Sequence, residues 1–327
     1  MRSRCAMRPL CAVVLCVSLS VSIPVVCAAE QAATPAAAAA AAGSSAPHGP
    51  QRFETPEQAA DALVTAAAKF DVPSLEKIFG PGNDDVVLSG EYGQDRQLAE
   101  DFTAQASEKK SVAVDPRSAS RAFLLVGKED WPFPVPIVKR GGKWSFDAPA
   151  GREEMIRRRI GRNELDAIEI CRGYVEAQYE YAYTKRDGYE VNQYAQHIIS
   201  TSGEHDGLAW KNADGSWGGP IGERVARAIE QGYSVSGDAY HGYFFKVLKG
   251  QGPDAPLGLT DYVVKGVMIG GFALVAVPAE YGQTGLKTFM VSQDGVVYEK
   301  DLGATTLDEF QRMDRFNPDR SWTPVPE

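Results

Sequence analysis

Residues 163–183 read NELDAIEICRGYVEAQYEYAY, and this stretch decides how the second half of the chain folds. Its apolar residues, among them Leu165, Ile168, Val175 and Tyr179, recur at spacings of three and four, which is typical of a helix with one apolar face. The other face carries the acidic residues Glu164, Asp166, Glu169, Glu176 and Glu180. Because the apolar stripe is narrow and the opposite face is charged, we expect this helix to lie on a sheet and not in a membrane.

The segments beside this helix predict the rest of a C-terminal domain over residues 151–327. On the N-terminal side, Arg152 to Arg159 predict a basic helical turn that ends at Gly161, so that Asn163 caps the long helix. On the C-terminal side, residues 187–220 are rich in glycine and show little periodicity. A short helix at 221–232, antiparallel strands at 243–248, 262–265, 272–277, 286–291 and 296–300, and a closing helix at 307–313 are expected to follow.

Residues 53–150 predict an N-terminal domain of helices followed by strands. The sequence TPEQ at 55–58 offers a hydroxyl cap, a proline in the first turn and a glutamine three residues after the cap, which together make a capping box. Helices are expected near 55–70, 72–79 and 96–108, and strands at 122–126, 135–139 and 143–147. This order resembles the cone-shaped fold of the nuclear-transport-factor-2-like superfamily. The whole chain is therefore expected to be an α+β protein of two domains.

The first 52 residues are expected to lie outside both domains. Residues 1–29 contain three arginines, an apolar run and then small residues, which is the layout of a secretory signal peptide cut after Ala28 or Ala29. A retained membrane anchor and lipoprotein processing at Cys27 are the alternatives. Residues 30–52 are rich in alanine, proline and glycine and predict a linker. We expect a periplasmic or secreted protein with no membrane span after signal cleavage.

Charge and cysteine content exclude several classes of function. The chain has 43 acidic and 34 basic residues and a formal net charge of −9, whereas nucleic acids and anionic lipids attract basic surfaces. We therefore expect no nucleic-acid partner. Four of the five cysteines lie in the predicted signal, so Cys171 alone remains and no intramolecular disulfide can form. Its place on the apolar side of the helix predicts a small core residue.

Three strings of the sequence resemble a known family. They are WPFPVPIVKRGGKWSFD at 131–147, AGREEMIRRRIGRNELDAIEICRGYVEAQYEYA at 150–182 and GGFALVAVPAEYGQTGLKTFMVSQDGVVYEKDLG at 270–303. Together they resemble the exported bacterial proteins grouped as domain of unknown function 2950. This resemblance implies export and a fold but no activity or catalytic residue, and it hints at an envelope protein as partner. The C-terminal part is also similar to the globular domains of type IV pilins and pseudopilins, although its helix is too charged to polymerise as theirs do.

The segment GEHDG at 203–207 is the densest local set of groups that can move a proton or hold a metal. Its candidate catalytic residues are His205, Asp206 and Glu204, with His197 eight positions before His205. Their spacing fits no standard zinc pattern, and a polar loop between glycines needs no chemistry to explain it. We therefore expect no metal and no cofactor, and keep the loop as the site of an alternative, hydrolase-like or metal-dependent activity.

Aromatic residues in loops and at strand edges are the second kind of candidate. Flat rings at such places stack on sugars, peptides or a partner chain, although they also serve as half-packed lids on a core. The candidate ligand-binding residues are Trp131, Trp210, Trp217, Tyr189 and Tyr240. A basic cluster, Arg157, Arg158, Arg159 and Arg162, lies beside Glu153, Glu154 and Glu164 and predicts a solvated, ion-paired junction, with an anion site as the alternative.

Familiar catalytic motifs are incomplete in this sequence. The turn NADGSWGG at 212–219 lacks the alternating ligands of a calcium loop, GGPIG at 218–222 lacks the lysine of a phosphate loop, and GYSVSG at 232–237 misses a nucleophile motif by one position. The leading hypothesis is therefore a non-enzymatic binding or envelope-assembly module whose partner is an envelope protein or a small ligand. The alternative is the enzyme that uses His205 and Asp206.

Overall fold

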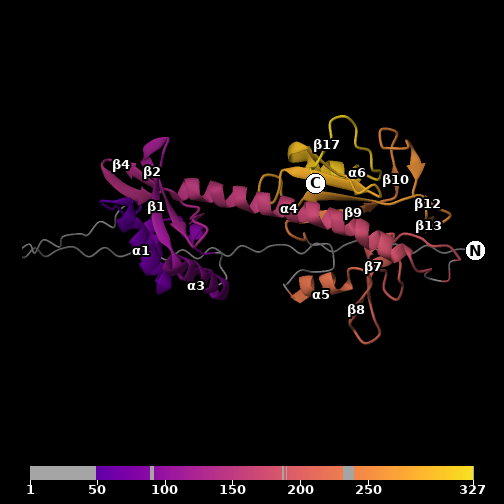
Figure 1. The fold of residues 1–327 in the computed structure, drawn as a ribbon, viewed down its shortest axis with the longest axis horizontal. Coiled ribbons are helices and arrows are strands. Elements are labelled where there is room, and N and C mark those ends of the chain that lie inside the picture. The colour runs from indigo at the N-terminus through magenta and orange to yellow at the C-terminus, as the bar shows by residue number, and fades with distance from the viewer. Residues whose placement is uncertain (1–48, 89–91, 186–187, 189, 231–238, 327) are drawn as a thin grey trace, which may run out of the picture. The chain divides into compact units, whose positions relative to one another are not determined.

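The computed structural model describes residues 49–88, 92–185, 188, 190–230 and 239–326 (Figure 1). The predicted signal peptide and most of the predicted linker lie outside the described residues. The described part contains helices and several antiparallel sheets, which confirms the α+β class. Its buried apolar residues form two separate clusters, one built from residues 53–148 and one from residues 167–322.

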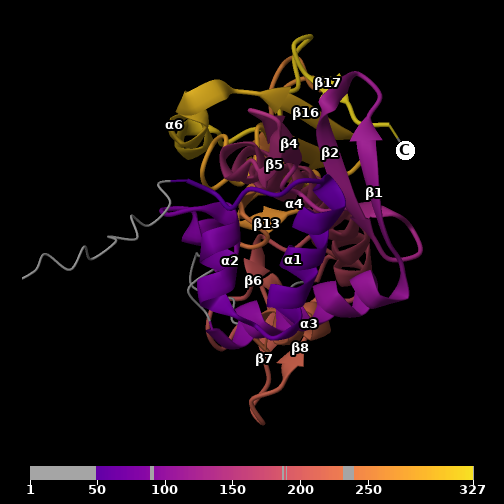
Figure 2. The ribbon, with the colours of Figure 1, turned by 90° about the vertical axis from the view of Figure 1, so that its left-hand side faces the viewer.

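The first cluster lies between three helices and a sheet. The helices are α1 (Pro56–Ala68), α2 (Val72–Phe79) and α3 (Tyr92–Glu108), and a 3-10 turn, η1 (Asp84–Val86), follows α2. The strands β1 (Lys110–Asp115), β2 (Ser118–Val126), β4 (Ile137–Arg140) and β5 (Lys143–Phe146) pair antiparallel in that order, and β3 (Trp131–Pro132) pairs with β2. The three helices lie together on one side of this sheet (Figure 2). Leu63, Phe79, Leu124, Ile137 and Phe146 fill the space between them.

The predicted capping box is present at the start of α1. The hydroxyl of Thr55 accepts a hydrogen bond from the backbone N–H of Gln58 at 3.2 Å. The Gln58 side chain in turn accepts from the N–H of Glu54 at 3.1 Å, one residue earlier than the usual reciprocal bond. The bond from Gln58 satisfies a backbone donor that the first helical turn leaves without a partner, and the bond from Glu54 satisfies the N–H of the residue just before the cap.

The second cluster surrounds a five-stranded antiparallel sheet. Its order is β17 (Thr323–Pro324), β16 (Val297–Asp301), β15 (Lys287–Ser292), β14 (Ala273–Pro278) and β9 (Tyr243–Leu248). Every residue of β14 is buried, because helix α4 (Ala148–Ala182) and helix α6 (Thr306–Arg312) both pack on this strand. Short hairpins complete this part of the chain: β10 (Gly250–Gln251) with β11 (Thr260–Asp261), and β12 (Val263–Val264) with β13 (Val267–Met268).

Helix α4 differs from the sequence prediction because it does not stop at Gly161. It runs unbroken for 35 residues from Ala148 to Ala182, and Asp147 is its cap. A glycine inside a helix costs only about 1 kcal/mol relative to alanine, which tertiary packing readily offsets. Among the described helices, α4 included, none combines the length and apolar composition that a membrane span needs.

Asn163 and Glu164 are therefore side-chain anchors within α4 and not a cap. The amide of Asn163 donates to the carbonyl of Thr284 at 2.9 Å. The carboxylate of Glu164 accepts from the backbone N–H groups of Leu286 and Lys287 at 2.9 and 3.1 Å. These three bonds fasten the middle of α4 to the start of β15. Part of the predicted set of ion pairs is present nine residues earlier, where Glu154 contacts both Arg157 and Arg158.

A small sheet forms in the region where the sequence shows little periodicity. It consists of β6 (His197–Ile199), β7 (Gly207–Lys211) and β8 (Trp217–Gly218), and helix α5 (Gly222–Glu230) follows it. The strands have three, five and two residues, which is too short for an alternating pattern to stand out. In Figures 1 and 2 this sheet and the C-terminal sheet lie on different sides of α4.

Two glycines of α4 give opposite expectations for replacement by alanine. A Cβ atom at Gly151 would lie 2.6 to 2.9 Å from the side-chain atoms of Val135, which is fully buried. We expect Gly151→Ala to lower the free energy of unfolding by about 1–3 kcal/mol, because the first core has no room for the methyl group. Urea denaturation followed by circular dichroism measures this change.

Gly161→Ala is the matched control, because a Cβ atom there meets nothing within 4 Å. The same substitution should then raise stability by up to about 1 kcal/mol through helix propensity alone. Equal effects of the two substitutions would contradict the continuous, packed helix.

Candidate functional site

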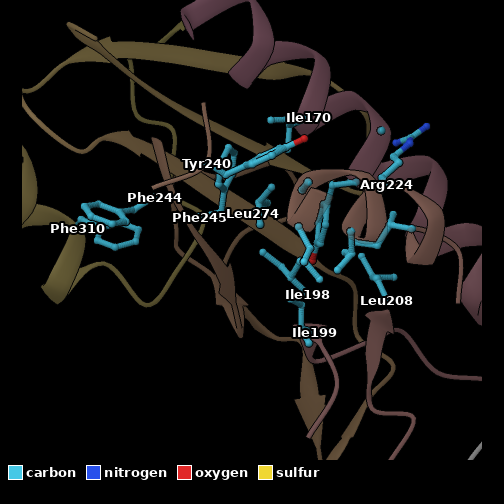
Figure 3. Close-up of a pocket in the computed structure, with 16 residues that line it drawn as sticks. Ile170, Ile198, Ile199, Leu208, Arg224, Tyr240, Phe244, Phe245, Leu274 and Phe310 are labelled. Atoms are coloured by element: carbon cyan, nitrogen blue, oxygen red, sulfur yellow. The ribbon is translucent and has the colours of Figure 1, made fainter. Parts of the chain in front are cut away.

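The described part of the chain contains an apolar pocket beside helix α4. Its volume is about 510 Å³, which is within the usual range for small-molecule sites. Helices α4 and α5, the small sheet, the edge strand β9 and helix α6 all contribute to its wall (Figure 3). The aliphatic lining residues include Ile170, Ile198, Ile199, Leu208, Ile221, Val225, Ile229 and Leu274, and the aromatic ones are Tyr174, Tyr240, Phe244, Phe245 and Phe310.

The apolar stripe of α5 supplies one side of the pocket. Ile221, Val225, Ala228 and Ile229 recur at helical spacing and all line it. The opposite face of α5 is solvated, and there Arg227 donates to Glu223 at 2.8 Å. A short helix with so pronounced an apolar face is stable when it packs on other elements, and α5 packs on β7 and β8 of the small sheet.

A buried hydrogen-bond network holds Tyr174 in the pocket wall. Gln178 is 0% exposed, and its amide donates to the Tyr174 hydroxyl at 2.9 Å and to the carbonyl of Ala195 at 2.8 Å. The Gln178 side-chain carbonyl accepts from the N–H of Ala195 at 2.8 Å. The Tyr174 hydroxyl donates to the carbonyl of Ala273. Burial raises the pKa of Tyr174, so this wall residue stays neutral.

Arg224 is the charged residue among the side chains that line the described pocket. It lies in the first turn of α5, and a Cβ atom at position 173 would be 2.6 Å from its Nη1 atom. Gly173 on α4 therefore leaves the space in which the guanidinium lies. An otherwise apolar cavity with a cation at its wall can bind a molecule that is itself apolar over most of its surface.

The predicted catalytic loop forms a local turn. The carboxylate of Asp206 accepts from both the N–H and the hydroxyl of Thr201 at 2.8 Å, and it lies 3.5 Å from Nε2 of His197. In a serine–histidine–aspartate triad the nucleophilic hydroxyl donates to an imidazole, whereas here the Thr201 hydroxyl donates to the carboxylate of Asp206. Glu204 is exposed, and the ring of His205 packs edge-on against Trp210 at 4.8 Å. This arrangement explains the loop as a structural turn, and a catalytic role for it stays a prediction without geometric support.

The third described histidine has a different carboxylate partner. His241 Nδ1 lies 2.7 Å from Asp166 on α4, and its ring contacts that of Tyr240 at 4.4 Å. Within the described ranges, no group of three or more histidine, cysteine or acidic residues is arranged to hold a metal ion. His197, His205 and His241 therefore do not converge on one set of carboxylates.

The predicted aromatic residues are spread over the chain, and one of them lines the pocket. Tyr240 lies in the pocket wall close to Ile170 (Figure 3). Trp210 and Trp217 are half-buried on the small sheet, and Trp131 is 58% exposed on β3 with the guanidinium of Arg158 5.5 Å from its ring. Tyr189 lies outside the described residues. A binding role for all five residues stays a prediction.

Most residues of the pocket carry no recognisable motif. They come from seven separate segments between positions 170 and 310, so proximity along the chain could not reveal them. The usable signal was the apolar stripe of α5, which predicts a packed face without saying what the face borders. The burial of Gln178 could not be predicted from the sequence either, because a polar residue in a helix is exposed more often than buried.

Replacing Gln178 tests the network behind the pocket wall. Gln178→Leu removes the partners of the N–H and carbonyl of Ala195 and leaves both groups buried. We expect the free energy of unfolding to fall by about 2–4 kcal/mol, because each buried unpaired group costs about 1–3 kcal/mol. Glu176→Leu, two residues away on the exposed face, should change it by less than about 0.5 kcal/mol. Chemical denaturation of both variants checks this, and equal losses would contradict the network.

Comparison with known proteins identifies a family without an assigned activity. No curated protein and no solved structure matches the chain. The likeness to the nuclear-transport-factor-2-like cone and to pilins therefore stays a prediction. The family described as "Protein of unknown function (DUF2950)" matches residues 50–325, which covers both clusters of buried residues and every residue that lines the pocket. The chain therefore belongs to the DUF2950 family.

Proposed function

We propose that this protein is a non-enzymatic binding module that holds a small apolar molecule in the pocket beside α4. The observation that carries the proposal is the cavity of about 510 Å³, whose wall combines aliphatic and aromatic side chains. Water in such a cavity finds few hydrogen-bond partners in the wall. The free energy of binding is therefore favourable when an apolar molecule displaces that water. Its described lining residues come from helices, strands and their ends, and none of them belongs to the predicted loop at 203–207.

Binding without chemistry is the version of this function that the side chains support best. Tyr174 lines the pocket and Cys171 lies in the core on the same helix, and burial raises the pKa of both. A nucleophile or general base needs the opposite shift, toward the ionised form near neutral pH. The geometry does not favour the hydrolase-like alternative at His205 and Asp206, because the Thr201 hydroxyl donates to the Asp206 carboxylate and not to an imidazole.

We also propose that the protein works outside the cytoplasm, either in the periplasm or after secretion. The support for this is the order of basic, apolar and small residues in the first 29 positions. An apolar ligand is sparingly soluble, so a protein that carries or senses it in an aqueous compartment is a consistent role. A single cysteine after the predicted cleavage site also suits an oxidising compartment.

A pair of alanine substitutions in α5 tests the proposed site. Ala228 lines the pocket, whereas Ala226 on the same helix does not. Ala228→Phe should fill part of the cavity and weaken the binding of 1-decanol, a neutral apolar probe, by about tenfold or more. Ala226→Phe should leave the affinity within about twofold. Isothermal titration calorimetry on folded protein measures both, and absence of saturable decanol binding by the wild type would refute the proposal.

The export proposal has its own experiment. The native protein, purified from the organism that encodes it, should begin after Ala28 or Ala29 and should be found in the envelope or the medium. Intact mass measurement with cell fractionation reports both properties. Recovery of a chain that still begins at Met1, or of a cytoplasmic protein, would contradict export.

A further inference from the structure

The charge of Arg224 is left without a partner in the described structure. Its neighbours on α4 and α5 show the contrast: Arg227 donates to Glu223 at 2.8 Å, and Arg172 donates to the carbonyl of Pro326 at 2.9 Å. Arg224 makes no ion pair or hydrogen bond with any described residue, although it lines the pocket. A guanidinium offers five N–H donors, and those of Arg224 remain available to a bound molecule.

Arg224 supplies the charge at one side of the pocket. Figure 3 shows Arg224 on one side of the cavity, with its guanidinium beside α4, whereas Phe244 and Phe310 lie on the far side of the group. Arg224 is exposed, so its charge lies at the edge of the cavity. Lys246, near Phe310, is already used: its ammonium donates to the carbonyl of Phe310 and lies 4.5 Å from that ring. One end of the cavity therefore has a cation with no partner among the described residues. The other end is aromatic, and the ammonium beside it is already hydrogen-bonded.

We propose that the pocket selects an amphipathic molecule with one carboxylate head and a single apolar tail, in the manner of a medium-chain fatty acid. The head would lie against the Arg224 guanidinium, whose planar fork matches the two oxygens of a carboxylate, and the tail would extend toward Phe244. The inference rests on the proposed function, since it specifies which apolar molecule the same pocket takes.

Because the protein as a whole is acidic, binding of a carboxylate depends on the local charge of Arg224. The chain carries a formal net charge of −9, so its general field repels anions. A carboxylate is then accepted only where a basic group compensates for the loss of water around it. Arg224 supplies such a group at the described pocket, and Gly173 keeps the space beside α4 open for it.

The test compares two probes of equal chain length, decanoate and 1-decanol, on three forms of the full protein. The measured quantity is the ratio of the decanoate affinity to the decanol affinity, obtained by isothermal titration calorimetry at pH 7.5. Arg224→Gln should lower this ratio about fivefold, as expected for loss of one partly exposed ion pair. Arg227→Gln removes an exposed charge on the same helix that is already paired with Glu223, and it should leave the ratio within about twofold of the wild type.

A charge reversal separates recognition of the head from a loss of folding. Arg224→Glu should bind decylammonium more tightly than decanoate, the reverse of the wild-type order, while decanol affinity stays within about twofold. If Arg224→Gln and Arg224→Glu keep the wild-type ratios, the inference about the carboxylate is wrong and the proposed apolar site stands. If neither decanoate nor decanol binds the wild type saturably, the proposed function itself fails.

Discussion

The packing of helix α4 on strands β14 and β15 is the interaction on which the C-terminal part of the protein depends. Ala167, Cys171, Tyr174 and Ala177, spaced three or four residues apart, turn one face of the helix into the second core. Asn163 and Glu164 add hydrogen bonds to the backbone at the start of β15. Burial raises the pKa of the Cys171 thiol to about 12, so it behaves as a small apolar residue, as its position in the sequence predicts.

The same helix also forms a wall of the pocket, and its composition explains why the pocket is apolar. Tyr174 and Gln178 carry polar groups into this region, but both are satisfied within the protein. A bound molecule therefore meets their hydrocarbon surfaces and not unpaired donors. Gly173 has the opposite role, since the missing side chain makes room for a charged one from α5. Because Gly173 is small and the polar groups of Tyr174 and Gln178 are hydrogen-bonded within the protein, Arg224 is the one cation without a partner among the described lining residues.

Local patterns predicted many elements well. The capping box at Thr55, the strand Tyr243–Leu248 and the closing hairpin at Ser292–Gly295 were all expected from short-range spacing and turn residues. Strand β1, the small sheet β6–β8 and the continuity of α4 through Gly161 were missed. Only the continuity of α4 depends on distant residues, since residues 284–287 hold its middle. Strand β1 pairs along its length with β2, which follows it directly in the chain, and β6, β7 and β8 also pair with near neighbours. Short strands also contain too few residues for periodicity to identify them.

The sequence by itself determined the α+β class, the acidic character, the buried cysteine and the order of most helices and strands, because these follow from composition and from spacings within one element. Tertiary structure alone decided the pocket and the place of Arg224, which is the charged residue among its described lining residues. The pocket residues belong to segments more than a hundred positions apart, and Arg224 lines it only because Gly173 lies opposite. Which side chains share a cavity is set by the packing of whole elements, and no local spacing records that packing.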